Sequence, residues 1–203
     1  MELIEKLNLI KNIKNNKELL FVHTPKCGGT FTKSILKDLN IKIIGHKQPT
    51  EDQKENFIIF TVIRDPIKRF ESLLNYRLQE TKPRNDWPKN LEYMHYDKSI
   101  SLNKIIEEFD ENDFEKIRPY KTLTYWTENV DICITINQLK DFLSFFSYNI
   151  NLDDYPKKNV SQKERGELNE KSIEKLSNIY KNDIELFNEN INEKIDINNL
   201  YFV

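Results

Sequence analysis

The sequence predicts an α/β fold in which helices cover both faces of a central parallel sheet. Short, continuously apolar segments alternate with amphipathic segments along the chain, and the most apolar one, FIIFTVI at 57–63, is followed directly by a helix start. Continuously apolar runs of this length are typical of strands that are buried on both sides in a parallel sheet. The chain has 203 residues, enough for one hydrophobic core, so we expect a single domain over 1–203.

The first half of the chain predicts a helix and then three strands. Leu3, Leu7 and Ile10 recur at the spacing of an amphipathic helix. Asp65 and Pro66 predict another helix start, because Asp is a good N-cap and proline suits the first helical position. The predicted elements are helix 2–15, strand 18–23, helix 31–39, strand 41–46, strand 57–63 and helix 67–78.

The segment 81–128 interrupts this alternation. Its first part, 81–98, contains two prolines and many aromatic residues, so we expect an irregular excursion over one edge of the sheet. A weakly helical stretch completes it, and we assign the whole segment to the acceptor side of the molecule. The predicted elements beyond it are strand 131–136, helix 138–146, a polar loop over 153–167 and one long helix over 169–189.

Composition excludes several classes of function. The net charge of −2 gives no global positive field, so we expect no nucleic-acid partner. No stretch of about 20 apolar residues occurs, so we expect no integral membrane segment. Cys27 and Cys133 lie far apart, which favours reduced thiols and a cytoplasmic location. No group of histidine, cysteine and carboxylate side chains has metal-ligand spacing, so we expect no metal.

The segment HTPKCGGT, 23–30, lies between a predicted strand and a predicted helix. Backbone N–H groups and the helix dipole converge on an anion at such a junction. Gly28 and Gly29 allow close wrapping, and Thr30 adds a hydroxyl. Lys26 precedes both glycines, whereas in GxxxxGK[ST] the lysine follows the second one, so the Walker pattern is absent. The alternative is a tight turn that carries a surface lysine.

A second candidate anchor follows the third strand. Arg64 stands at the carboxyl end of this strand, where open α/β sheets bind ligands, and its planar fork suits a phosphate. Ser72 follows eight residues later on the next helix. In the alternative interpretation, Arg64 pairs with a carboxylate such as Asp65, and Ser72 is an ordinary surface hydroxyl.

Taken together, these segments resemble a known family. A strand–PKxGGT–helix segment followed by strand–RDPxxRxxS resembles the sulfotransferases that use 3′-phosphoadenosine 5′-phosphosulfate (PAPS), particularly the carbohydrate-sulfotransferase branch. KKNVSQKERGEL resembles the loop that closes over the nucleotide in that family, and Tyr180 and Asp183 match its later Tyr-x-x-Asp pattern. The similarity spans 19–187 and, with the phosphate loop, gives the expectation of a P-loop NTPase-like three-layer fold.

The resemblance also implies a set of site residues. PAPS is the co-substrate and adenosine 3′,5′-bisphosphate the product, with no metal required. The family's first motif cradles the 5′-phosphosulfate and its second grips the 3′-phosphate. The chain departs at Cys27, where threonine is more usual, although the backbone N–H is what the loop needs. The nucleotide-binding residues are then Lys26, Cys27, Gly28, Gly29, Thr30, Arg64, Ser72, Ser161 and Arg165.

The expected reaction is an in-line transfer of the sulfuryl group to a hydroxyl or amine acceptor. Lys26 neutralises the charge that grows on the leaving phosphate. His46, at the end of the second strand, is the leading candidate for the general base, and His95 or a nearby carboxylate is the alternative. His46 can equally be a loop histidine with a structural hydrogen bond. We expect His23 to be a packed residue that shapes the phosphate loop.

The acceptor and two rival functions stay open at this stage. The excursion combines aromatic and basic residues, which suit a sugar, a phenol or an acidic glycan, or form a small satellite core with a charged rim. The rivals are a P-loop kinase and a protein that binds the nucleotide without catalysis. The aromatic and basic residues concerned are Trp87, Tyr93, Tyr96, Lys82, Arg84 and Lys89.

Overall fold

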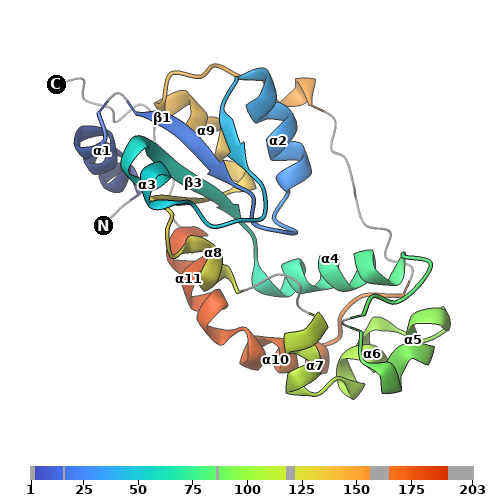
Figure 1. Cartoon of the computed structure of the whole chain (residues 1–203). Helices are drawn as coiled ribbons and strands as arrows, with labels where there is room; N and C mark the ends of the chain where they lie inside the picture. Colours follow the sequence, from blue (N-terminus) through green and yellow to red (C-terminus); the bar gives the residue numbers. More distant parts are fainter. Residues whose placement is uncertain (1–2, 16, 86, 118–121, 156–164, 192–203) are drawn as a thin grey trace.

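The computed structural model describes residues 3–15, 17–85, 87–117, 122–155 and 165–191, and it confirms the α/β fold class. All strands of its four-stranded sheet run parallel, and helices flank the sheet (Figure 1). The elements are α1 (Leu3–Ile13), β1 (Glu18–Val22), α2 (Gly29–Asp38), β2 (Lys42–Ile44), α3 (Glu51–Asn56), β3 (Phe57–Ile63), α4 (Pro66–Leu78), η1 (Lys89–Leu91), α5 (Glu92–Tyr96), α6 (Leu102–Glu108), α7 (Glu111–Ile117), α8 (Leu123–Thr127), β4 (Ile132–Thr135), η2 (Ile136–Gln138), α9 (Leu139–Phe145), η3 (Leu152–Asp154), α10 (Glu170–Ile179) and α11 (Lys181–Ile191).

The strand order β2-β1-β3-β4 places β1 and β3 side by side in the middle of the sheet. Leu20 of β1 faces Lys42 of β2 on one side and Ile59 of β3 on the other. The chain leaves β1 toward β2 and then returns past β1 to form β3, so the order reverses at this pair. Ligands of open α/β sheets bind outside the carboxyl ends of the strands at such a reversal.

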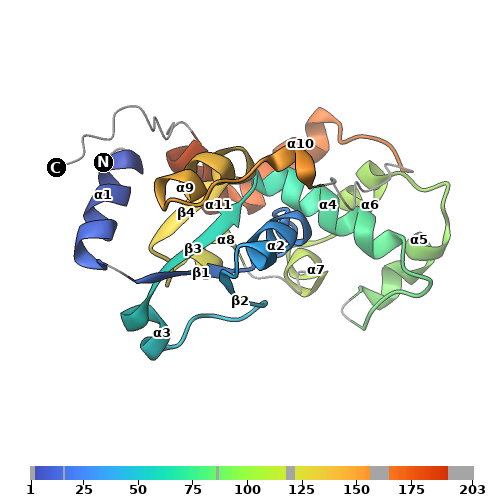
Figure 2. The same ribbon diagram turned by 90° about the horizontal axis from the view of Figure 1, so that it is seen from above.

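The two faces of the sheet have different covers. Phe21 and Phe60 lie in the main core with residues of α1, α2 and α9. Leu20 and Ile59, which alternate with them along the strands, pack against Trp126 of α8 in a smaller cluster. Figures 1 and 2 show α2 and α9 on one side of the strands and α8 with α11 on the other. This arrangement agrees with three layers.

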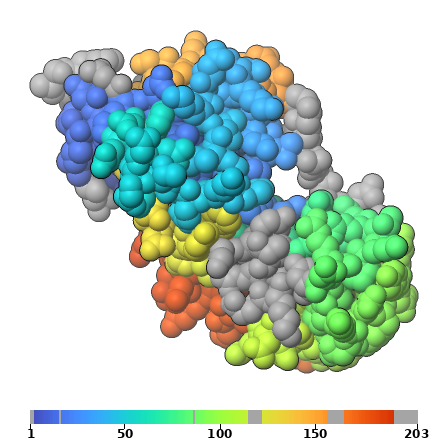
Figure 3. Space-filling model, in the orientation of Figure 1, coloured from blue at the N-terminus to red at the C-terminus, as the bar shows by residue number. Residues whose placement is uncertain are grey.

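The excursion differs from its prediction. Part of 81–98 is helical, in η1 and α5, and the excursion packs on α4 and α10. Trp87, Met94 and Phe109 are buried there and form a second core with Phe70 of α4. In Figure 3 the excursion, in green, forms a lobe beside the N-terminal part of the chain, which is in blue and cyan. Helices this short contain too few residues for a helical period of apolar residues to be recognised in the sequence.

The last predicted helix is also corrected, because it is two helices that meet at Tyr180. This residue has φ −105° and ψ 24°, outside the helical range, and its buried ring lies 5.7 Å from that of Phe70. The amphipathic pattern runs through both helices, so the sequence alone does not reveal the break. No helix of the described part of the chain is long and apolar enough to cross a membrane.

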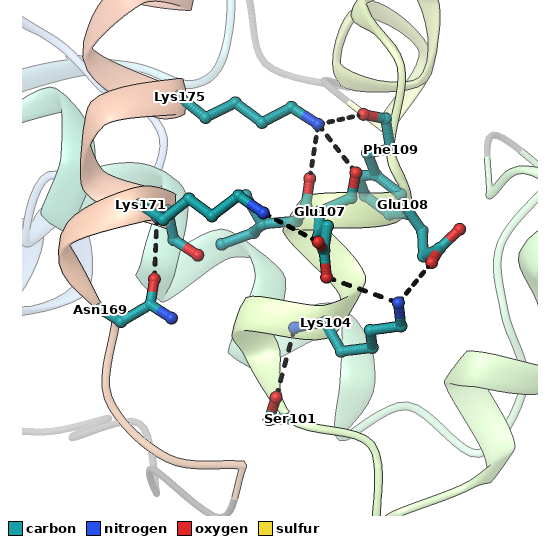
Figure 4. Close-up of polar contacts among 10 residues, drawn as sticks. Ser101, Lys104, Glu107, Glu108, Phe109, Asn169, Lys171 and Lys175 are labelled. Atoms are coloured by element: carbon teal, nitrogen blue, oxygen red, sulfur yellow. Dashed lines mark hydrogen bonds and ion pairs between the residues drawn. The ribbon is translucent and has the colours of Figure 1, made fainter.

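Lys175 joins α10 to the excursion. Its ammonium donates hydrogen bonds to the carbonyl oxygens of Ile106, Glu107 and Phe109 at the end of α6, at 2.6–3.0 Å (Figure 4). These carbonyls are left without partners within the helix, and a lysine there also offsets the negative end of the helix dipole. The joint fixes α10 relative to α6.

Candidate functional site

Residues 23–30, the predicted phosphate loop, follow the carboxyl end of β1 and lead into α2. Gly28 is the N-cap of α2 with φ 80°, a left-handed conformation that favours glycine, and it makes no side-chain cap. A Cβ on Gly29 would lie 1.7 Å from Nε2 of His23, so only glycine fits there. Gly28, as the N-cap residue, offers no side chain to cap α2, and the N–H groups at a helix start attract anions.

Two contacts hold the loop in place from neighbouring elements. Nε of Arg69, on α4, donates a 3.0 Å hydrogen bond to the carbonyl oxygen of Pro25. The Thr24 hydroxyl lies 2.7 Å from that of Thr61, which itself donates to the carbonyl oxygen of Val22. The loop is therefore fixed on the β3 side by groups that are buried and hydrogen-bonded.

Lys26 and Arg64 come together at this edge of the sheet. Lys26 follows β1 and has φ 63°, and Arg64 follows β3 and is exposed. Partial burial lowers the pKa of Lys26, and the positive charge of Arg64 lowers it further. Two cations from adjacent strand ends are thus close enough to repel each other, and a bound anion would offset that repulsion.

Cys27 is buried beside these cations. Its thiol donates a 3.6 Å hydrogen bond to the carbonyl oxygen of Pro25, and burial raises the pKa of Cys27 to about 11, although Arg69 and Arg64 act in the opposite direction. A thiol with so high a pKa stays protonated at neutral pH and is a poor nucleophile. Its side chain therefore helps to fill the core of the loop.

His23 is buried beneath the loop, as predicted. Its pKa is lowered to about 4 by burial first and then by His46 and Lys33. The rings of His23 and His46 lie 4.2 Å apart between centroids. The ring of His23 is therefore neutral at neutral pH and adds no positive charge beneath Gly29.

His46 lies beside the loop on the β2 side and is exposed. Its Nδ1 is 2.8 Å from the carbonyl oxygen of His23, and a carbonyl can only accept, so Nδ1 carries the hydrogen. In the neutral ring the lone pair is then on Nε2, the form that a general base requires. This hydrogen bond also belongs to the structural alternative for His46, so it favours neither interpretation.

The remaining predicted residues lie in different places. Thr30 is exposed at the start of α2, and Ser72 is half-buried on α4. Arg165 is buried and donates to the carbonyl oxygens of Met94 and His95 at 2.7 and 2.8 Å, so its partners in this structure are on the excursion. Ser161 lies outside the described residues, and the contacts proposed for it and for Arg165 with the nucleotide stay predictions.

His95, the alternative base, is enclosed by the excursion. Only 4% of it is exposed, and its Nε2 lies 3.0 Å from the carbonyl oxygen of Arg77. The ring of Trp87 packs edge-on at 5.3 Å. Within the described residues, His46 is therefore the histidine that combines exposure with a place beside the phosphate loop.

Arg69, Asp183 and Tyr76 contribute to the site, although none was assigned a role from the sequence. Asp183, 1% exposed, accepts hydrogen bonds from the N–H groups of Leu123 and Thr124, and one of its oxygens is 4.0 Å from Arg69. Arg69 and Asp183 belong to the RDPxxRxxS and Tyr-x-x-Asp patterns, so their spacing was available as a signal. Tyr76 follows Ser72 by one helical turn and belongs to neither pattern.

Comparison with known proteins adds no family: no family model, no curated protein and no solved structure matches the chain. The function is therefore inferred from the arrangement of the site. It combines the N-terminus of α2, a glycine pair and two mutually repelling cations at the reversal of strand order. Chemically, this arrangement can hold an anion such as a phosphate or sulfate ester.

Proposed function

We propose that this chain transfers the sulfuryl group of PAPS to a hydroxyl or amine acceptor, with carbohydrates among the candidate acceptors. The observation that carries the proposal is the placement of Lys26 and Arg64 at the ends of adjacent parallel strands, with Lys26 in the glycine loop that leads into α2. A nucleotide with phosphate groups at both its 5′ and 3′ positions offers a separate anion to each cation. Gly28 and Gly29 leave room for the 5′ group, and Arg64 with Ser72 receives the 3′-phosphate.

The chemistry that these residues support is a direct displacement. The acceptor oxygen or nitrogen forms a bond to sulfur while the bond from sulfur to the 5′-phosphate oxygen breaks, and the bonding electrons leave with the bisphosphate. Lys26 and the loop N–H groups stabilise the charge that grows on that oxygen. The acceptor proton passes to Nε2 of His46, since Nδ1 is already bonded to His23.

The nucleotide preference tests this proposal. We expect adenosine 3′,5′-bisphosphate to raise the melting temperature more than ATP with magnesium does, because only the former carries a 3′-phosphate. Transfer of radiolabelled sulfuryl from PAPS to a panel of sugars, phenols and amines then identifies the acceptor. Stabilisation by ATP with magnesium alone would favour a kinase, and binding of the bisphosphate without transfer to any acceptor would favour a non-catalytic nucleotide-binding protein.

A further inference from the structure

Tyr76 of α4 lies against the side chain of Lys26. The Lys26 ammonium is 4.5 Å from the centroid of the Tyr76 ring, which is a cation–π contact, and 40% of Tyr76 is exposed. The guanidinium of Arg84 also lies 5.7 Å from this centroid, and its Nη2 donates to the tyrosine hydroxyl at 3.4 Å. The ring thus faces the one lysine that the phosphate loop contains.

Three further features of the structure surround the contact between Lys26 and Tyr76. Arg69, Leu73 and Tyr76 follow at i, i+4 and i+7, so they lie on one face of α4, and Arg69 of this face bonds the loop at Pro25. Lys26 lines a cavity of about 20 Å³ together with Arg69 and Leu73 of this face, whereas Tyr76 is not part of its lining. Lys26 itself has φ 63°, a strained conformation for a residue other than glycine.

We propose that Tyr76 is a positioning residue that holds the Lys26 ammonium on its ring in the nucleotide-free protein and releases it to the arriving phosphate group. The negative face of the ring offsets part of the repulsion that Arg64 exerts on Lys26. A charge-assisted hydrogen bond to a phosphate is stronger than a half-exposed cation–π contact, so the anion displaces the ring. The release by a nucleotide rests on the proposed function, whereas the contact with the ring does not.

The resting contact is measured without any activity. Reductive ¹³C-methylation of the lysines keeps their charge, and the methyl resonance of Lys26 is assigned by its loss in Lys26→Arg. A ring current shifts this resonance upfield, so we expect the shift to vanish in Tyr76→Leu and to persist in Tyr76→Phe, which keeps the ring and removes the hydroxyl. Tyr76→Gln is a second ringless variant. Identical resonances in the wild type and in a folded ringless variant would overturn the proposal.

The release is measured on the same resonance. Adenosine 3′,5′-bisphosphate and, separately, pyrophosphate are titrated into the methylated protein, and we expect loss of the upfield shift with either anion. If pyrophosphate moves the resonance and the bisphosphate does not bind, the inference stands and the proposed function fails. If neither anion moves it, the release is wrong.

The direction in which Tyr76→Leu changes the affinity for the anion distinguishes a positioning role from a merely structural one. Because the ring competes with the phosphate for Lys26, Tyr76→Leu should bind the anion that moves this resonance about two- to fivefold more tightly, with Tyr76→Phe unchanged. Tyr93→Leu on α5, another exposed tyrosine, serves as the matched control. Calorimetric titration with that anion gives both values. Weaker or equal binding by Tyr76→Leu would overturn the proposal, because damage to the fold or a ring that stays in the bound site would produce it.

Discussion

Two lysines, Lys26 in the phosphate loop and Lys104 on α6, differ in how the protein treats their charge. The pKa of Lys104 is raised, by hydrogen bonds to Glu108 first and then to Glu107 (Figure 4). The pKa of Lys26 is lowered, by burial first and then by Arg64. On α6 the carboxylates of Glu107 and Glu108 therefore compensate the charge of Lys104, whereas the edge of the sheet keeps two cations in mutual repulsion. Such unfavourable placement is typical of functional sites, because a ligand rather than the protein supplies the compensating charge.

The largest effect is expected for the general base. His46→Ala should lower turnover by roughly 100-fold to 10,000-fold with little change in nucleotide affinity, the usual range for a positioned acid–base group. His46→Asn is the matched control, because an amide N–H can keep the bond to the His23 carbonyl but cannot accept a proton at neutral pH. If His46→Asn retained most of the activity, His46 would be only a structural residue, and the assignment would pass to a nearby carboxylate or His95.

Lys26→Ala tests whether the charge of Lys26 contributes to catalysis. We expect turnover to fall on the order of 100-fold or more, because a preorganised charge at the leaving oxygen is lost. Affinity for the bisphosphate should fall much less. Steady-state kinetics and a calorimetric titration separate the two quantities, and nearly normal turnover would remove Lys26 from the mechanism.

Arg64→Ala tests whether its partner is the ligand. Loss of a charge-assisted contact should weaken binding of the bisphosphate by roughly 10-fold to 100-fold, and the melting temperature should not fall. The pKa of Lys26 should also rise, because a neighbouring positive charge disappears. A lower melting temperature with normal binding would show that Arg64 pairs with a carboxylate of the protein.

His23 predicts a pH dependence of stability. Its pKa is lowered from 6.5 to about 4, so the unfolded chain binds a proton at a higher pH than the folded protein does. The free energy of unfolding should therefore fall as the pH drops from about 6.5 to about 4, by roughly 1 kcal/mol between pH 7 and pH 5 once solvent screening is allowed for. Urea unfolding at the two pH values, in the wild type and in His23→Gln, measures this effect. An equal pH dependence in both proteins would contradict it.

The smallest effect on turnover is expected for Lys104, the second lysine of the comparison. Lys104→Ala removes an exposed cation that is paired with two carboxylates, so nucleotide affinity and turnover should stay at wild-type values and the melting temperature should change little. It is the matched control for Lys26→Ala. A loss of turnover in Lys104→Ala would mean that the different environments of the two lysines do not reflect a difference in function.

The strands of the sheet, the strand-to-helix loop at 23–30 and the main helix starts could be predicted from the sequence alone. Apolar runs mark the strands because both faces are buried, and Asp65 caps α4 as predicted, accepting from the N–H of Lys68 at 2.8 Å. The glycine pair could be recognised from its place between a strand and a helix, and the structure explains Gly29, where the tight space above His23 excludes any side chain.

Contacts between residues far apart in the chain could be seen only in the folded protein. Tyr76 reaches Lys26 across 50 positions of sequence, and Asp183 joins the start of α8 to Arg69. The break at Tyr180 and the packing of 81–98 on α4 also depend on partners distant in the chain. Periodicity and capping report on a residue's own segment, whereas these contacts are set by how whole elements pack, and a single sequence holds no local signal for that.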